Sequence, residues 1–185
     1  MNKKTLEFVV ALVFVLLAVV FRLIPHAPNF TPITAIALFG GVYFSRKTAL
    51  ILPMLAMLIS DLFIGLYDFK LMAVVYLSFL LAVGLGFMLK KNKTQKWHLV
   101  AGGAILASVL FFVVTNFAVW AFSPWYSKTI TGLIQCYIMG LPFFKNTLLG
   151  NLFYTSVLFG AYELSKVWIR SKFGAKSSTS SLAKI

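Results

Sequence analysis

The sequence predicts an all-α integral membrane protein: a bundle of six transmembrane helices with its N- and C-termini in the cytoplasm. Three observations carry this prediction. Hydrophobic residues make up 61% of the 185 residues and charged residues only 11%, whereas a soluble domain carries about a quarter charged residues. The mean hydropathy is +0.93, and apolar runs of about 20 residues, the length that crosses a bilayer, recur along the chain. The basic residues also gather in alternate connections, as the topology of membrane proteins requires.

The first four expected spans follow the apolar runs of the N-terminal half. Residues 6–24 begin like a signal peptide, but no small-residue cleavage site follows, so we expect a retained helix. Residues 32–45 are short for a span and contain two adjacent glycines, so a re-entrant segment is the alternative. Residues 48–67 and 70–89 are the third and fourth spans, and the basic connection KKNKTQK follows them.

The C-terminal half predicts two further spans. Residues 98–122 form a long apolar run and residues 146–169 the last one, while the mixed stretch 123–144 between them is expected to be an outer connection. Residues 1–170 therefore form one six-helix domain. The tail 171–185 is basic and rich in serine, so we expect it to be disordered in the cytoplasm.

The distribution of charge favours this topology in a bacterial cytoplasmic membrane, because positive residues resist translocation. Only Arg22, Lys70, Lys128 and Lys145 fall on the outer side. The same rule accounts for the net charge of +13. A nucleic-acid partner is not expected, because the sequence has no basic helix interleaved with aromatic residues. The other 13 of the 17 basic residues fall inside: Lys3, Lys4, Arg46, Lys47, Lys90, Lys91, Lys93, Lys96, Lys166, Arg170, Lys172, Lys176 and Lys184.

Polar residues in or beside the expected spans gather on the outer side. The stretch RLIPHAPNFTP, residues 22–32, interrupts an almost unbroken apolar sequence, and its three prolines stiffen the backbone. Ionisable groups inside a membrane are costly and usually face a protein interior or a cavity, so an outer pocket is the economical explanation. The candidate substrate-binding residues are Arg22, His26, Asn29, Phe30, Asp61, Asn116, Trp120, Gln135, Tyr137, Asn146, Asn151 and Tyr154.

Several of these candidates have a purely structural alternative. Arg22 can extend to the outer headgroups with its apolar stem along the bundle. Asp61 can pair with Arg22 or with Lys70 at the membrane interface. Asn116 and Asn151 can form hydrogen bonds between helices rather than to a substrate.

Enzyme chemistry, metals and cofactors are not expected. The chain has no H-E-x-x-H, G-x-S-x-G or P-loop motif, and the two histidines, His26 and His98, fall on opposite sides of the expected membrane. Cys136 and His26 are only weak metal candidates, because an inert buried thiol and a loop histidine are the commoner cases. Without an ATP-binding motif, any pumping energy must come from a partner or an ion gradient.

Four stretches resemble an uncharacterised family of small six-span bacterial transport proteins: RLIPHAPNFTPITAIALFGGVYF, LPMLAMLISDLFIGLYD, FFVVTNFAVW and GLIQCYIMGLPFFKNTLLGNLFYTSVLFG. This family is distantly similar to the S components of energy-coupling-factor vitamin transporters. The resemblance implies six helices with both ends inside, and a ligand bound from the outer side under the loops. It implies that the loop with His26 and Asn29 acts as a lid. The residues that it places in the pocket wall are Asp61, Asn116, Trp120 and Asn151.

The expected function is therefore capture of a small vitamin-like or cofactor-like molecule from the outer side of the bilayer for uptake. The resemblance also implies an energising membrane module with ATPases as a partner. S components dock through small residues four apart on the first helix, whereas here Ala11 and Ala18 are seven apart, so a solitary transporter is an alternative. The alternative outside transport is a structural or assembly protein of the envelope that binds a protein on its outer side.

Overall fold

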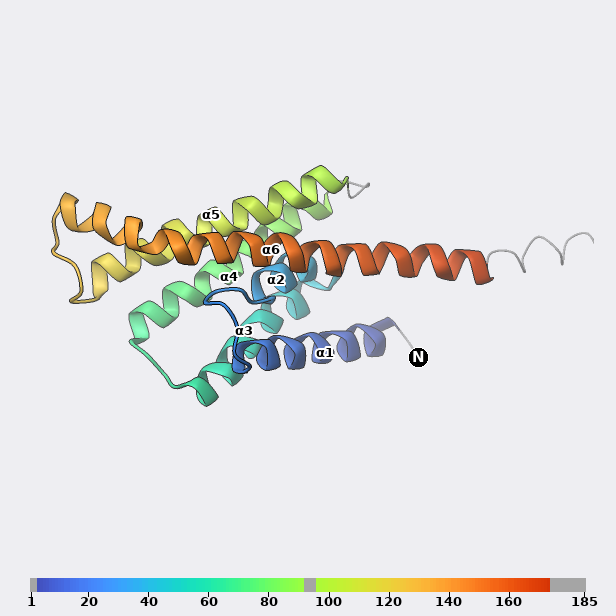
Figure 1. The fold of residues 1–185 in the computed structure, drawn as a ribbon. Coiled ribbons are helices and arrows are strands. Elements are labelled where there is room, and N and C mark those ends of the chain that lie inside the picture. The colour runs from blue at the N-terminus through green and yellow to red at the C-terminus, as the bar shows by residue number, and fades with distance from the viewer. Residues whose placement is uncertain (1–2, 92–95, 174–185) are drawn as a thin grey trace, which may run out of the picture.

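The computed structural model describes residues 3–91 and 96–173 of the chain, and six helices without any strand make up this part (Figure 1). The expected all-helical class is confirmed for these residues. The first five helices begin and end within three residues of the expected segments. The helices are α1 (Lys3–Leu23), α2 (Ile33–Tyr43), α3 (Arg46–Ile64), α4 (Phe69–Lys90), α5 (Trp97–Phe122) and α6 (Ile130–Phe173).

Three of the helices, α3, α4 and α5, are long and apolar enough to cross a membrane, judged by length and composition within the described residues. The helix α2 is apolar but has only 11 residues. At 1.5 Å per residue it is about 16 Å long, roughly half the thickness of a bilayer's hydrocarbon core. It is therefore too short to cross a membrane by itself.

The short helix α2 lies in the middle of the bundle. Every residue from Ile33 to Val42 is buried, which is the pattern of a helix surrounded by protein on all sides. It contacts α3, α4, α5 and α6, and more weakly α1. Because its neighbours are longer, its N-terminal end lies inside the bundle, and Ile33 there is only 1% exposed.

The last helix differs most from the expectation. It has 44 residues and is about 66 Å long, roughly twice the thickness of the hydrocarbon core. The prediction of a loop at 123–144 was wrong for residues 130–144, which form about the first four turns of α6. Three candidate residues, Gln135, Cys136 and Tyr137, therefore lie on a helix and not in a loop.

Side-chain contacts with α5 explain why this first part of α6 is helical despite Pro142, which removes a backbone hydrogen bond in its interior. Cys136 donates from Sγ to the carbonyl oxygen of Asn116 at 3.3 Å, and the Tyr137 hydroxyl donates to that of Val113 at 2.8 Å. Gly140 lies directly against the Asn116 side chain, where a larger residue would overlap it. The two helices are therefore held together along a length that the sequence pattern did not reveal.

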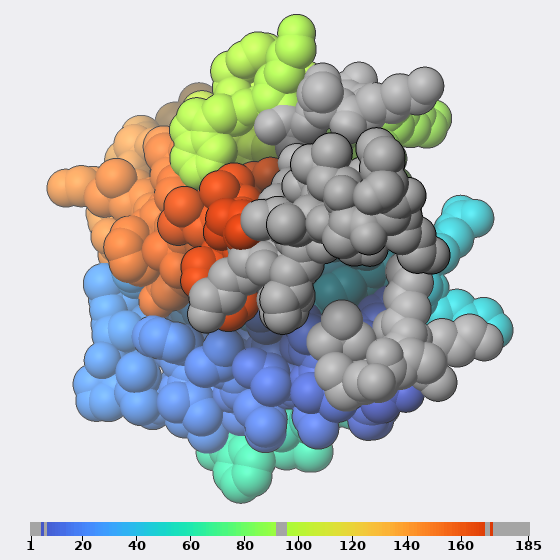
Figure 2. All heavy atoms as spheres, turned by 90° about the vertical axis from the view of Figure 1, so that its right-hand side faces the viewer, coloured from blue at the N-terminus to red at the C-terminus, as the bar shows by residue number. Residues whose placement is uncertain are grey.

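The ends of the helices lie at two opposite ends of the bundle. In Figure 1 the start of α1, the end of α4, the start of α5 and the end of α6 lie toward the right, while the connections 65–68 and 123–129 lie toward the left. Figure 2 views the right-hand end, where α5 (green) lies at the top, α6 (orange to red) at the left and centre, and α1 (blue) toward the bottom. The expected tail is helical at 171–173, and its remainder, 174–185, lies outside the described residues.

Candidate functional site

A cavity of about 410 Å³ lies at the N-terminal end of α2, beside the connection 24–32 between α1 and α2. Each of the six helices contributes to its wall, and its volume falls in the range of small-molecule sites. The polar wall consists of Arg22, His26, Asn29, Thr31, Thr34, Tyr67, Thr115 and Thr147. The apolar wall consists of Ile33, Met57, Ile64, Val75, Phe79 and Phe111.

The short length of α2 gives the cavity a physical origin. A helix of 11 residues cannot fill the middle of a bundle whose other helices have 19 residues or more. The connection 24–32 runs beside the space that precedes the first turn of α2. His26, Asn29 and Thr31 of this connection line the cavity. The cavity therefore follows from one interrupted helix among longer ones.

A tight turn shapes this connection. The Phe30 N–H donates to the carbonyl oxygen of Ala27 at 3.0 Å, and Asn29 has a φ of +64°. Proline at the second position and a positive φ at the third are the features of a type II turn, in which Asn is tolerated because its side chain permits the left-handed region. The turn places the Asn29 side chain at the cavity.

Aromatic packing fixes the end of the connection to α6. The ring of Phe30 lies 5.5 Å from that of Tyr154 and 6.0 Å from that of Phe153, measured between centroids. It covers Gly150, where any side chain would press on Phe30. The candidates Phe30 and Tyr154 are thus brought together, but as the anchor of the connection and not as part of the cavity wall.

His26 lies exposed at the rim of the cavity. Its Nδ1 is 2.7 Å from the carbonyl oxygen of Ile24. A carbonyl can only accept, so Nδ1 carries the proton in this contact and Nε2 is the acceptor of the neutral ring. The ring is therefore held by its own connection, and its Nε2 atom is turned away from that bond.

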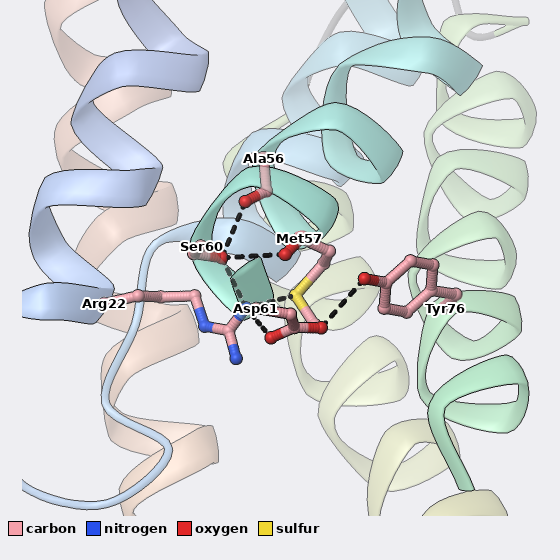
Figure 3. A network of polar contacts seen from close by, with 6 residues as sticks. All are labelled: Arg22, Ala56, Met57, Ser60, Asp61 and Tyr76. Carbon is pink, nitrogen blue, oxygen red and sulfur yellow. Dashed lines mark hydrogen bonds and ion pairs between the residues drawn. The ribbon is translucent and has the colours of Figure 1, made fainter. Parts of the chain in front are cut away.

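The wall residue Arg22 forms an ion pair with Asp61, which lies behind the wall (Figure 3). Arg22 Nη1 lies 2.7 Å from Asp61 Oδ1, and it also donates to Ser60 Oγ at 2.5 Å and to Met57 Sδ at 3.1 Å. Tyr76 donates to the second carboxylate oxygen, Oδ2, at 2.8 Å. Both oxygens of this carboxylate, which is 2% exposed, therefore have a donor.

This network gives the two charged residues different roles. Asp61 is enclosed by Arg22 and Tyr76 and does not line the cavity, whereas the Arg22 side chain, 17% exposed, does. The alternative that Asp61 pairs with Arg22 is therefore what the structure shows. Burial, followed by the charge of Asp61, raises the pKa of Tyr67 in the connection 65–68 to about 12, so this wall residue is a neutral phenol at physiological pH.

Four candidates on the α5–α6 pair do not line this cavity. Asn116 donates to a carbonyl one turn earlier in its own helix at 2.9 Å, and Trp120 donates from Nε1 to the carbonyl of Ser127 at 2.9 Å. Tyr137 is bonded to α5 as described above, and Gln135 is exposed. The Tyr137 contact joins α5 to α6, and the Trp120 contact closes the turn between them.

Two further candidates on α6 lie next to the cavity wall without forming it. Asn146 is half-buried, and Asn151 is 2% exposed and donates to Ser108 Oγ at 2.8 Å. The Oδ1 atom of Asn151 and the hydroxyl of Thr155 are buried without a hydrogen-bond partner in the described part of the chain. Polar groups therefore continue along α6 beyond the cavity.

Sequence reasoning missed several wall residues. Thr147 follows the candidate Asn146 by one residue, and it shares the buried face of α6 with Asn151 and Thr155, four and eight residues on. All three residues lie within the expected span 146–169, so this spacing could have identified Thr147. The aromatic wall residues Phe79 and Phe111 gave no such signal, because they resemble ordinary core positions.

A metal site finds no support in the described residues, where no three His, Cys, Asp or Glu side chains come together to hold an ion. Cys136, a weak candidate, is 2% exposed and its Sγ donates to the Asn116 carbonyl oxygen. It therefore acts as a small buried side chain between α5 and α6.

Comparison with known proteins gives a family but no characterised relative. No curated protein and no solved structure matches the chain. The range matched by one family model includes all of the described residues. The chain belongs to a family of unknown function, DUF6580, whose model matches residues 2–173.

Proposed function

We propose that the protein is a multi-pass protein of the bacterial cytoplasmic membrane that captures a small molecule from the outer side for uptake. The observation that carries this proposal is the cavity at the N-terminal end of α2, which combines convergent polar groups with an aromatic wall. Ligand sites have this composition. A bundle that served only as a scaffold would gain more from filling the space, because cavities destabilise a core.

The arrangement of the helix ends supports the orientation. The connections 65–68 and 123–129 lie at one end of the bundle in Figure 1, and the basic residues at the start of α1 and at the ends of α4 and α6 lie at the other. With the basic end in the cytoplasm, the connection 24–32 and the cavity open to the outside. A six-span topology with both termini inside requires α2 and its preceding connection to complete the second crossing together.

The energy source is the second part of the proposal. Ala11 is 8% and Ala18 0% exposed, because both face the interior of the bundle, whereas Phe8, Leu12 and Leu16 on the outer face are large. This face of α1 offers no row of small residues for close docking of a membrane partner. We therefore favour a solitary transporter over one that docks an energising module with ATPases through α1.

Native mass spectrometry of the protein, purified gently from cells grown in rich medium, tests the proposal. We expect a stoichiometric small molecule that is lost when Val75→Phe fills the cavity wall. The matched control is Leu77→Phe, which changes an exposed residue of the same helix. A protein that carries no small molecule but retains a second polypeptide would reject the proposal in favour of the envelope assembly protein.

A further inference from the structure

We infer that the captured ligand bears a single carboxylate, held between the free edge of Arg22 and the N-terminus of α2. The inference rests on the proposed function, because it names the chemistry of the molecule that the cavity takes. It depends on two features of residues that line the same cavity, and on their combined charge.

The first feature is the unused side of the Arg22 guanidinium. Its contacts to Asp61, Ser60 and Met57 all pass through Nη1. Among the described residues, none provides an acceptor to Nη2 or Nε, and Figure 3 shows Nη2 pointing away from the network. A planar pair of N–H donors in a largely buried wall fits the two oxygens of a carboxylate.

The second feature is the start of α2. Its N-cap position is Pro32, which provides no side-chain hydrogen bond, and the first backbone bond is from the Ile36 N–H to the Pro32 carbonyl at 2.8 Å. The amides of Ile33, Thr34 and Ala35 precede that bond, and all three residues are buried. Ile33 and Thr34 line the cavity. Uncapped amides and the positive end of the helix dipole favour an anion.

The balance of charge selects one negative charge on the ligand. Asp61 already neutralises the charge of Arg22. The positive charge left for a ligand is that of the α2 dipole, equivalent to about half an elementary charge, together with the N–H donors of Arg22 and of the first turn of α2. A carboxylate uses these donors fully. A phosphate dianion would bring a second negative charge close to the buried Asp61, whose carboxylate already pairs with Arg22.

The apolar wall specifies the rest of the molecule. Phe79 and Phe111 lie on one side with their ring centroids 5.3 Å apart, and Met57 joins them in the wall. Flat or branched apolar groups pack well on such rings and on a flexible thioether. The ligand class is therefore a monocarboxylate with an apolar or aromatic body.

Three probes that differ only in their polar group test this inference: benzoate, benzamide and phenyl phosphate. Each is titrated against the full-length protein in detergent, with the shift of the unfolding temperature as readout. We expect benzoate to bind about tenfold more tightly than either of the others, because charge-assisted hydrogen bonds are about twice as strong as neutral ones. Equal or tighter binding of benzamide would overturn the carboxylate, and tighter binding of phenyl phosphate would overturn the single charge. A lack of response to benzoate would also overturn the inference, while a molecule retained in native mass spectrometry would leave the proposed function in place.

Two variants assign the preference to Arg22. Arg22→Lys keeps a cation beside Asp61 but lacks the planar fork, so we expect the affinity for benzoate to fall about tenfold. The double variant Arg22→Gln with Asp61→Asn removes both charges together, and we expect it to bind benzoate no better than benzamide. Arg46→Gln, at the exposed start of α3, is the control and should bind benzoate as the wild type does. Unchanged benzoate affinity in a folded Arg22→Lys protein would refute the assignment.

Discussion

Gly41 of α2 and Gly86 of α4 face each other with no side chain between the two backbones. A Cβ atom on Gly41 would overlap the backbone of α4 at Val83, and one on Gly86 would overlap that of α2 at Leu38. Small residues allow this closeness between membrane helices, where packing replaces the hydrophobic effect as the main attraction. The contact fixes the depth of α2 in the bundle and, with it, the position of the cavity at the other end of α2.

We expect Gly41→Ala and Gly86→Ala each to destabilise the protein by about 1–3 kcal/mol, because the added methyl group must separate two backbones. The measurement is the unfolding temperature in detergent. Gly84→Ala is the matched control on the same helix, since a Cβ there meets no atom within 4 Å. It should be neutral or stabilising because alanine favours a helix by about 1 kcal/mol over glycine. Equal effects of Gly84→Ala and Gly86→Ala would show that the two backbones are not in contact.

Much of the fold was predictable because apolar length and polar breaks mark helices directly. The prolines and the polar residues of 22–32 end α1, and the basic run after Lys90 ends α4. The start of α6 was not predictable by this route. Glycine and proline near residues 140–142 indicate a loop, but packing against α5 through Cys136 and Tyr137 keeps that stretch helical.

The candidate site was predictable in part. Arg22, His26 and Asn29 line the cavity and Asp61 supports Arg22, because a polar residue in an apolar sequence needs a partner or a cavity. The same argument cannot separate a ligand contact from a bond between helices. Asn116 therefore appeared equivalent to Asn29, although its amide is bonded within α5.

The ion pair of Arg22 and Asp61 should be more sensitive to single than to double replacement. Asp61→Asn or Arg22→Gln alone leaves one buried charge without its partner, so each should lower stability by roughly 3–5 kcal/mol. The double variant should lose much less, because both desolvated charges disappear together. Unfolding temperatures of the four proteins form a double-mutant cycle. Additive losses would mean that the two side chains do not interact in the folded protein.

Asn29 offers a test of the turn that is independent of ligand binding. At a φ of +64°, Asn29→Gly should retain the stability of the turn because glycine adopts this conformation freely. Asn29→Ala should cost about 1 kcal/mol, since a Cβ without a local hydrogen bond disfavours the left-handed region. Hydrogen exchange of the connection 24–32 distinguishes the two. Faster exchange in Asn29→Gly than in Asn29→Ala would contradict the turn geometry.

The membrane topology can be tested by cysteine labelling, because the wild type gives a low background: Cys136 is only 2% exposed. We expect Ser127→Cys to react with a membrane-impermeant maleimide from outside and Ser45→Cys to react only after the cytoplasmic side is opened. Both positions are exposed and lie beyond the ends of helices. Residue 45 decides the issue, since it follows the short helix.

Residue 45 reports the topology because of the length of the second crossing. The 11 residues of α2 cover about 16 Å, and the connection 24–32 can extend over the remaining depth of roughly 15 Å. If the connection enters the bundle in this way, Ser45 lies in the cytoplasm and the cavity is reached from outside. Labelling of Ser45→Cys from outside would instead make α2 a re-entrant segment. The basic start of α3 would then face outward, and the orientation on which uptake depends would be reversed for the segments that follow.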